Sequence, residues 1–146
     1  QAPARGDETQ ESGAPPHGGE TILLVDDEEA IQRLTQRSLA GHGYTVLTAS
    51  DGPQALAALG RHGKPVDLLI TDVVMPGIGG RELALDIKRK DLARRTLFMS
   101  GYTDDALLNR GVLESGLAFL YKPFSTDALL KRVRQVLDAP PDQDRA

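Results

Sequence analysis

Acidic residues follow two apolar stretches of the chain that have the composition of buried β-strands. The aliphatic stretch Ile22–Val25 runs into four carboxylates, the first two being Asp26 and Asp27. A second, largely apolar stretch, 66–70, is followed closely by Asp72. Three carboxylates close together repel one another and cannot all stay ionised cheaply unless a cation joins them. Oxygen ligands without His or Cys suit Mg²⁺, so we interpret these aspartates as half of a metal site.

Two other polar residues occupy the corresponding place after later apolar stretches. Ser100, followed by Gly101, comes after the stretch 96–99, and Lys122 comes after 117–121. A metal ion and an ammonium group would balance the charge of a phosphoryl group, while a hydroxyl donates a hydrogen bond to it. A carboxylate can also be the nucleophile, as in enzymes that form an aspartyl phosphate. The combined set of side chains indicates phosphoryl chemistry.

The elements that must position these side chains alternate regularly along the chain. The expected strands are ILLV at 22–25, YTVL at 44–47, VDLLI at 66–70, TLFM at 96–99 and LAFLY at 117–121. Each gives way to a stretch with helical spacing of its apolar residues. Five strands alternating with five helices predict an α/β fold with a parallel sheet that is covered on both faces. In such sheets ligands bind beyond the carboxyl ends of the strands, where the acids, the hydroxyl and the ammonium fall.

Capping residues and apolar periodicity predict where the helices begin and which faces they bury. Asp27, Thr103 and Ser125 each precede acidic residues, as helix N-termini prefer. The apolar positions expected to face the core are Ile31, Leu34 and Leu39 in the first helix, and Leu129, Leu130, Val133, Val136 and Leu137 in the last.

Composition limits the classes of function. The 146 residues, 40% of them hydrophobic, suffice for one domain with a substantial core. The net charge of −4 argues against a nucleic-acid binder, and we interpret the basic run Lys88–Arg95 as a solvated helix end. The absence of cysteine excludes disulfides and thiolate metal sites. No apolar run approaches the roughly 20 residues of a membrane span, so we expect a cytoplasmic protein without membrane contact.

Composition also divides the chain into three segments. Residues 1–19 are rich in Pro, Gly and charge and contain no apolar residue larger than alanine. Such a segment cannot bury enough surface to offset its ordering entropy, which predicts a disordered tail or linker. Residues 139–146 are expected to form a second disordered tail, which leaves 20–138 as the folded domain.

Four motifs, taken together, resemble the receiver domain of two-component response regulators. They are VDD at 25–27, TDxxMPxxxG at 71–80, SGY at 100–102 and KPF at 122–124. Their order and spacing are similar to those of the family over residues 20–138. The resemblance implies a flavodoxin-like, doubly wound sheet with strand order 2-1-3-4-5. It also implies a signalling domain whose own chemistry is limited to self-phosphorylation and autodephosphorylation.

The resemblance implies a role for each residue of the site. Asp72 would accept a phosphoryl group from a phosphohistidine on a histidine kinase or a histidine phosphotransfer protein. Mg²⁺, for which Mn²⁺ could substitute, would be held by Asp72, by Asp27 directly, by Asp26 mainly through water, and by the backbone carbonyl of Val74. Lys122 would pair with the phosphoryl group, and its peptide bond to the following proline would be cis.

The resemblance also implies a switch and a set of modulating residues. Ser100 would swing toward the phosphoryl oxygens, and Phe119 would turn inward behind it. Gly101 is the small residue that leaves the site open to a partner. Val74 and Tyr102 would flank the path of the hydrolytic water, and neither carries a carboxylate or carboxamide to orient it. We therefore expect slow dephosphorylation.

Other interpretations of the acids remain open. An aspartate-nucleophile phosphatase would have a DxD nucleophile after the first strand, whereas here Asp26 is followed by Asp27. A degenerate receiver, which binds partners without phosphorylation, conflicts with the competent residue types at all five functional positions. Glu28 and Glu29 are interpreted as first-turn acids that favour the helix dipole.

The resemblance leaves the output open as well. The first helix is expected to meet the histidine-bearing partner, and the region Asp104–Leu137 is expected to carry the signal. Two segments resemble the C-terminal receivers of hybrid sensor kinases, namely HGGETILLVDDE at 17–28 and MSGY at 99–102. The output would then be a downstream protein or covalently linked kinase domains, with the receiver acting as a phosphorelay intermediate or phosphate sink in the latter case.

Overall fold

Five parallel strands form the central sheet of the computed structural model, which describes residues 17–101 and 118–140. The strands are β1 (Thr21–Val25), β2 (Thr45–Ala49), β3 (Leu68–Asp72), β4 (Thr96–Gly101) and β5 (Ala118–Lys122). They are ordered β2-β1-β3-β4-β5, and every neighbouring pair is parallel. The predicted doubly wound α/β fold and its strand order are confirmed.

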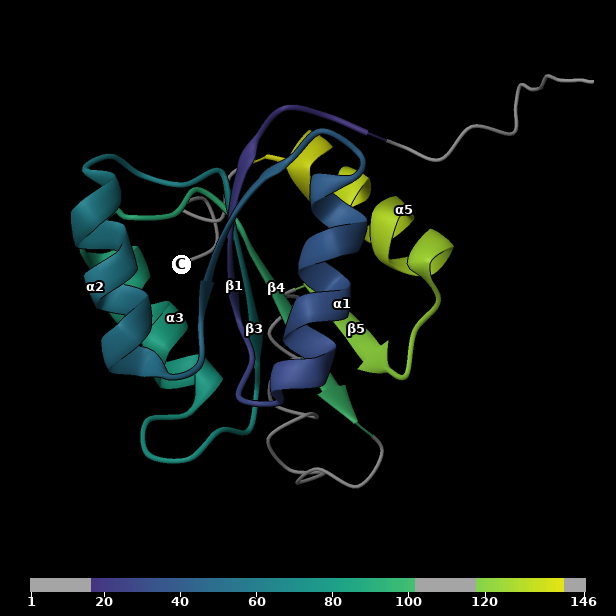
Figure 1. Ribbon diagram of the computed structural model, residues 1–146. Helices are drawn as coiled ribbons and strands as arrows, with labels where there is room; N and C mark the ends of the chain where they lie inside the picture. The colour runs from purple at the N-terminus through teal and green to yellow at the C-terminus, as the bar shows by residue number, and fades with distance from the viewer. Residues whose placement is uncertain (1–16, 102–117, 141–146) are drawn as a thin grey trace, which may run out of the picture.

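Helices cover both faces of this sheet. Among the described residues they are α1 (Glu29–Ala40), α2 (Gly52–His62), α3 (Gly80–Arg89) and α5 (Thr126–Asp138). Figure 1 shows α2 and α3 on one side of the sheet and α1 and α5 on the other. None of these four helices is long and apolar enough to cross a membrane. The helix expected between β4 and β5, with Thr103 at its start, lies outside the described residues.

The alternation of side chains along each strand supplies two cores, one on each face. In β1, Leu23 and Val25 belong to the cluster beneath α2 and α3, whereas Ile22 and Leu24 belong to the cluster beneath α1 and α5. Successive side chains of a strand point to opposite faces, so a strand covered on both sides must be apolar throughout. This explains why the four fully buried residues of β1 that lead to the acids, Ile22–Val25, are all apolar.

The helix α5 forms as its sequence predicts. The side chain of Ser125 accepts a hydrogen bond from the Ala128 N–H at 3.0 Å and so caps the first turn. The five apolar residues expected to face the core, Leu129, Leu130, Val133, Val136 and Leu137, are all buried. These five residues pack against β1, β3 and β4 in the core beneath α1 and α5 and so hold α5 against the sheet.

The helix α1 departs from the prediction in two ways. Its N-cap residue is Glu28 and not Asp27. Leu34, expected in the core, is 63% exposed. The buried residues of α1 are instead Thr35 and Leu39. Leu34 lies one position before Thr35 and is therefore rotated by about 100° around the helix axis, away from the core. Leu34 therefore does not contribute to the core, and its apolar side chain is available on the surface of α1.

The short segment before β1 is joined to α5 through one guanidinium group. Arg134 binds both carboxylate oxygens of Glu20, at 2.6 and 3.2 Å, and it also donates to Asp138 and to the hydroxyl of Tyr44. A further hydrogen bond of 3.1 Å reaches the backbone carbonyl of His17. The hydrogen bonds from Arg134 hold the pKa of the Glu20 carboxyl below its usual range. In Figure 1 this segment passes above α1 and α5.

We expect Arg134→Gln to lower the free energy of unfolding by about 1–2 kcal/mol, because it removes a bidentate, partly buried pair that joins distant parts of the chain. The side chains of Arg134 and Glu20 are 24% and 30% exposed. Arg33→Gln is the matched control, since its pair with Glu29 is 62% and 75% exposed and should contribute less than about 0.5 kcal/mol. Urea denaturation measures both, and equal losses in the two variants would contradict the prediction.

Candidate functional site

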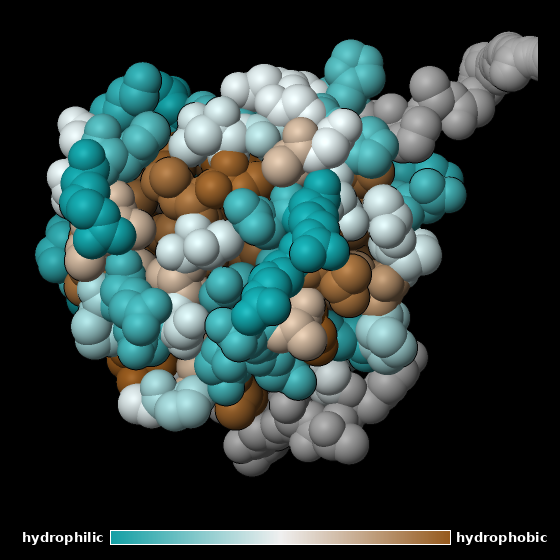
Figure 2. Space-filling model, viewed as in Figure 1, coloured by the Kyte–Doolittle hydropathy of each residue, from teal (hydrophilic) through white to brown (hydrophobic). Residues whose placement is uncertain are grey.

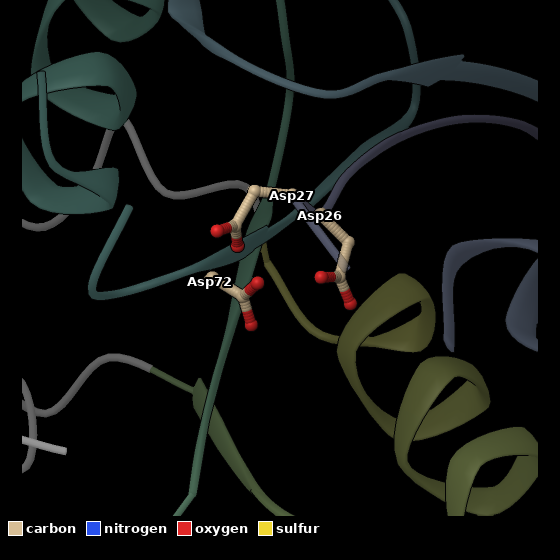
Figure 3. Close-up of side chains that lie close together, drawn as sticks. All are labelled: Asp26, Asp27 and Asp72. Carbon is tan, nitrogen blue, oxygen red and sulfur yellow. The ribbon is translucent and has the colours of Figure 1, made fainter. Parts of the chain in front are cut away.

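Three aspartates meet at the carboxyl edge of the sheet, toward which the arrowheads of β4 and β5 point in Figure 1. Asp26 and Asp27 follow β1, and Asp72 is the last residue of β3. Because β1 and β3 are parallel neighbours, their ends lie side by side. One carboxylate oxygen of each aspartate lies within 4.8 Å of the others. Figure 3 shows the carboxylates of Asp26, Asp27 and Asp72 close to one another.

The three aspartates differ in their surroundings. Asp26 is fully buried, Asp72 is 4% exposed and Asp27 is exposed. Oδ1 of Asp26 accepts a hydrogen bond of 2.9 Å from the Glu28 N–H, whereas its buried Oδ2 has no hydrogen-bond donor among the described residues. The ammonium of Lys122 lies 3.1 Å from this oxygen without hydrogen-bond geometry, so the buried atom can still accept a further cation. The hard oxygen donors of the three aspartates fit a magnesium-type ion.

Lys122, the last residue of β5, reaches across the edge of the sheet into the acids. Its Nζ lies 2.8 Å from Asp72 Oδ1 and 3.0 Å from Glu28 Oε1, and it forms an ion pair of 3.1 Å with Asp26 Oδ2 that lacks hydrogen-bond geometry. Burial disfavours the ammonium, but the hydrogen bond and charge of Asp72 outweigh that cost, so the pKa of Lys122 lies above its usual range. The bond from Lys122 to Pro123 is cis, as expected. The site therefore keeps one fixed cation.

Asp72 is the most perturbed carboxyl of the site. Burial raises its pKa most, and the neighbouring Asp26 raises it further, while Lys122 opposes both effects. The net result is a pKa of about 8 instead of 3.8. One ammonium does not compensate for the desolvation and the like charge together. A cation of higher charge would favour the ionised, nucleophilic form of Asp72.

Sequence reasoning missed the part that Glu28 has in the site. Its carboxylate contacts Lys122, a residue 94 positions away in the chain, and does not merely favour the dipole of α1. No local signal marks this contact, because it depends on β1 and β5 ending at the same edge. The position of Glu28 directly after two predicted ligands was the available hint.

The predicted switch and modulating residues lie around this edge in different settings. Ser100 is fully buried near the end of β4, and its hydroxyl donates to the Gly101 carbonyl at 3.4 Å. Phe119 is 8% exposed within the core beneath α2 and α3, with its ring 4.7 Å from that of Tyr121 in an edge-to-face contact. Val74 is 39% exposed beside the acids. The predicted water-flanking residue at position 102 lies outside the described residues.

A groove leads from the acids along α1 toward the start of α5. The walls near the acids include Asp27, Glu28 and Lys122, and the apolar wall is contributed by Leu34 and Phe124. Figure 2 shows apolar surface on and beside α1, interrupted by hydrophilic side chains. The groove opens at Asp72, so a partner seated on α1 could reach that carboxylate.

Comparison with known proteins agrees with the geometry. The family model of the response regulator receiver domain matches residues 22–134. A sensor kinase, CckA of Brucella abortus (strain 2308), is 36% identical over 121 residues, which are 83% of this chain and 13% of the kinase. PhoP of Bacillus subtilis (strain 168), an alkaline phosphatase synthesis transcriptional regulatory protein, is 34% identical over 80% of this chain and 48% of the regulator.

Solved structures are similar in the same way. The receiver domain from the hybrid histidine kinase CckA superposes with a TM-score of 0.64 and 38% identity, covering 81% of this chain and 99% of that domain. The Vibrio cholerae chemotaxis protein CheY4 gives a TM-score of 0.70 at 28% identity, with 82% and 99% covered. The chain thus spans about half or less of the two curated relatives but nearly all of these two solved chains. The chain belongs to the response regulator receiver domain family, the phosphoryl-accepting domains of two-component signalling.

Proposed function

We propose that Asp72 is the phosphoryl acceptor of this receiver and that its donor is a phosphohistidine on a histidine kinase or histidine phosphotransfer protein. The observation that carries the proposal is the 2.8 Å contact between Lys122 Nζ and Asp72 Oδ1 beside two further aspartates. Asp72 is the only acid that ends one of the described strands, and the ammonium of Lys122 held against it favours transfer to Asp72 over transfer to its neighbours.

The proposed transfer is an in-line displacement at phosphorus. An Asp72 oxygen forms the new P–O bond, the P–N bond to the imidazole breaks, and the imidazole nitrogen leaves with the electron pair and takes up a proton. Lys122 pairs with the phosphoryl oxygens, and the hydroxyl of Ser100 donates to them. Movement of Ser100, followed by Phe119, then alters the surface that the partner contacts.

A Mg²⁺ ion, or Mn²⁺ in its place, would be held by Asp26, Asp27, Asp72 and the backbone carbonyl of Val74. The buried Asp26 Oδ2, which lacks a donor, and the hard oxygen set favour such an ion. The bound metal would neutralise charge that develops on the phosphoryl oxygens. Asp26 also places the N–H of Glu28, and thereby the first turn of α1, beside the site.

The direct test is to incubate the protein with Mg²⁺ and acetyl phosphate and to weigh it intact by mass spectrometry. We expect the parent to gain one phosphoryl group and Asp72→Asn to gain none. Asp51→Asn, at the N-cap of α2, removes an equivalent carboxylate elsewhere and should label like the parent. Equal labelling of the parent and Asp72→Asn would show that another carboxylate is the acceptor.

We expect the phosphorylated protein to lose its phosphoryl group slowly, with a half-life of minutes or longer. Val74, next to the acids and 39% exposed, has no polar atom in its side chain with which to orient an attacking water. Val74→Asn should shorten the half-life several-fold, as measured by phosphate release from the labelled protein. A half-life of seconds in the parent would contradict this expectation.

The histidine-bearing partner is proposed to dock over the groove along α1. Leu34 is 63% exposed there, and the groove ends at the acceptor, so apolar docking would bring a phosphohistidine to Asp72. The similarity to the receiver of a hybrid kinase supports a second possibility for the same chemistry. In that case the domain would act as a phosphorelay intermediate or phosphate sink for covalently linked kinase domains.

A further inference from the structure

Glu28 is an acidic side chain at the mouth of the site. Its carboxylate lies 3.0 Å from Lys122 Nζ and is 58% exposed, whereas Lys122 is 11% exposed. The backbone of Glu28 is fixed, because its N–H donates to Asp26 Oδ1 at 2.9 Å and its carbonyl accepts from the Gln32 N–H at 2.9 Å. The carboxylate thus stands between solvent and the ammonium that faces Asp72.

This placement has two electrostatic consequences for an incoming phosphoryl group. First, Glu28 occupies a hydrogen-bonding direction of Lys122 that a phosphoryl oxygen would otherwise use. Second, it adds a negative charge where a donor must enter a site that already holds three aspartates. Coulomb repulsion scales with the charge of the donor and is only partly screened at such short range. Both effects penalise a doubly charged donor more than a singly charged one.

We propose that Glu28 is a specificity-determining residue that selects phosphodonors by their net charge, disfavouring small dianionic donors. The inference rests on the proposed function, since it concerns entry to the same acceptor, Asp72. It gives the domain a means of resisting phosphorylation by small metabolites with acyl phosphate groups. A protein donor is less affected, because contacts along the groove hold it in place.

Two small donors of different charge test this selection. With acetyl phosphate, which is mainly dianionic near neutral pH, an Asp72 oxygen bonds to phosphorus, the P–O bond to acetate breaks, and acetate leaves with the electron pair. With phosphoramidate, which carries one net negative charge, the P–N bond breaks and ammonia leaves. Initial rates of labelling are measured for each donor by intact mass spectrometry, at Mg²⁺ concentrations that saturate each variant.

We expect Glu28→Gln to raise the rate with acetyl phosphate about three- to tenfold and the rate with phosphoramidate by a smaller factor. The ratio of the two rates should rise at least about twofold. Glu29→Gln is the matched control: it removes the same charge one residue away, from a side chain that is 75% exposed and pairs with Arg33. Its ratio should stay near that of the parent.

Three outcomes separate the possibilities. An unchanged ratio in Glu28→Gln, or an equal rise in Glu29→Gln, overturns the selection by Glu28. Labelling of an Asp72→Asn protein would instead overturn the proposed acceptor. Glu28→Gln should fold like the parent, because the Glu28 side chain makes no capping hydrogen bond to α1. Circular dichroism should show that the helical content of the variant is unchanged.

Discussion

Replacing Asp72 with asparagine is expected to stabilise the metal-free protein, by an amount that grows as the pH rises from about 4 to about 8. Burial and Asp26 raise the folded-state pKa of Asp72 to about 8, whereas the unfolded chain keeps the ordinary value. Between these values the folded protein binds a proton that the unfolded chain has lost. Raising the pH therefore lowers the free energy of unfolding of the parent. Asparagine resembles the protonated carboxyl and has no such proton to lose.

The gain should be small below about pH 4 and on the order of 5 kcal/mol at pH 8, as measured by urea denaturation in a chelator. Asp127→Asn changes an exposed carboxylate in the first turn of α5, so its difference from the parent should stay within about 0.5 kcal/mol at every pH. Mg²⁺ should stabilise the parent more than Asp72→Asn, because the variant has lost one of the carboxylates that hold the ion in the folded state. The prediction would be wrong if the difference in the free energy of unfolding between Asp72→Asn and the parent stayed constant or shrank as the pH rises. Ionisation of Asp72 would then not destabilise the folded protein.

Most of the fold follows from local pattern, because each apolar run is followed by a helix that covers the sheet. The apolar stripe of α5 was predicted correctly, since all five of its members are buried in the core on that face of the sheet. The gathering of Asp26, Asp27 and Asp72 was likewise predictable, because the carboxyl ends of parallel strands share one edge. These features need only periodicity and the rule that parallel sheets are covered on both faces.

The features that were missed depend on contacts between distant residues. The pairing of Glu28 with Lys122 arises from the order of strands in the sheet, and the pairing of Glu20 with Arg134 spans 114 positions. Leu34 was placed in the core because leucine at helical spacing usually is buried, yet Thr35 occupies that face. Composition cannot distinguish a leucine that packs from one that a partner will cover.

The exposure of Leu34 leads to the prediction with the largest effect on signalling. Leu34→Gln should slow transfer from a purified phosphohistidine domain that phosphorylates the parent by about 30- to 100-fold. The reason is that we expect Leu34 to be a hot spot of the docking surface, and truncating a hot-spot residue costs about 2 kcal/mol or more of binding. Glutamine is neutral and favours helices, so α1 and the electrostatics of the site should be preserved.

Labelling by acetyl phosphate separates docking from chemistry, because it needs Asp72 and Lys122 but no contact with α1. Its rate in Leu34→Gln should stay within about twofold of the parent. Leu85→Gln is the matched control, since Leu85 is 51% exposed on α3, across the sheet from the groove. It should leave both reactions unchanged. If both leucine variants slowed transfer equally, the donor would not dock on α1, and the exposed leucine would need another partner.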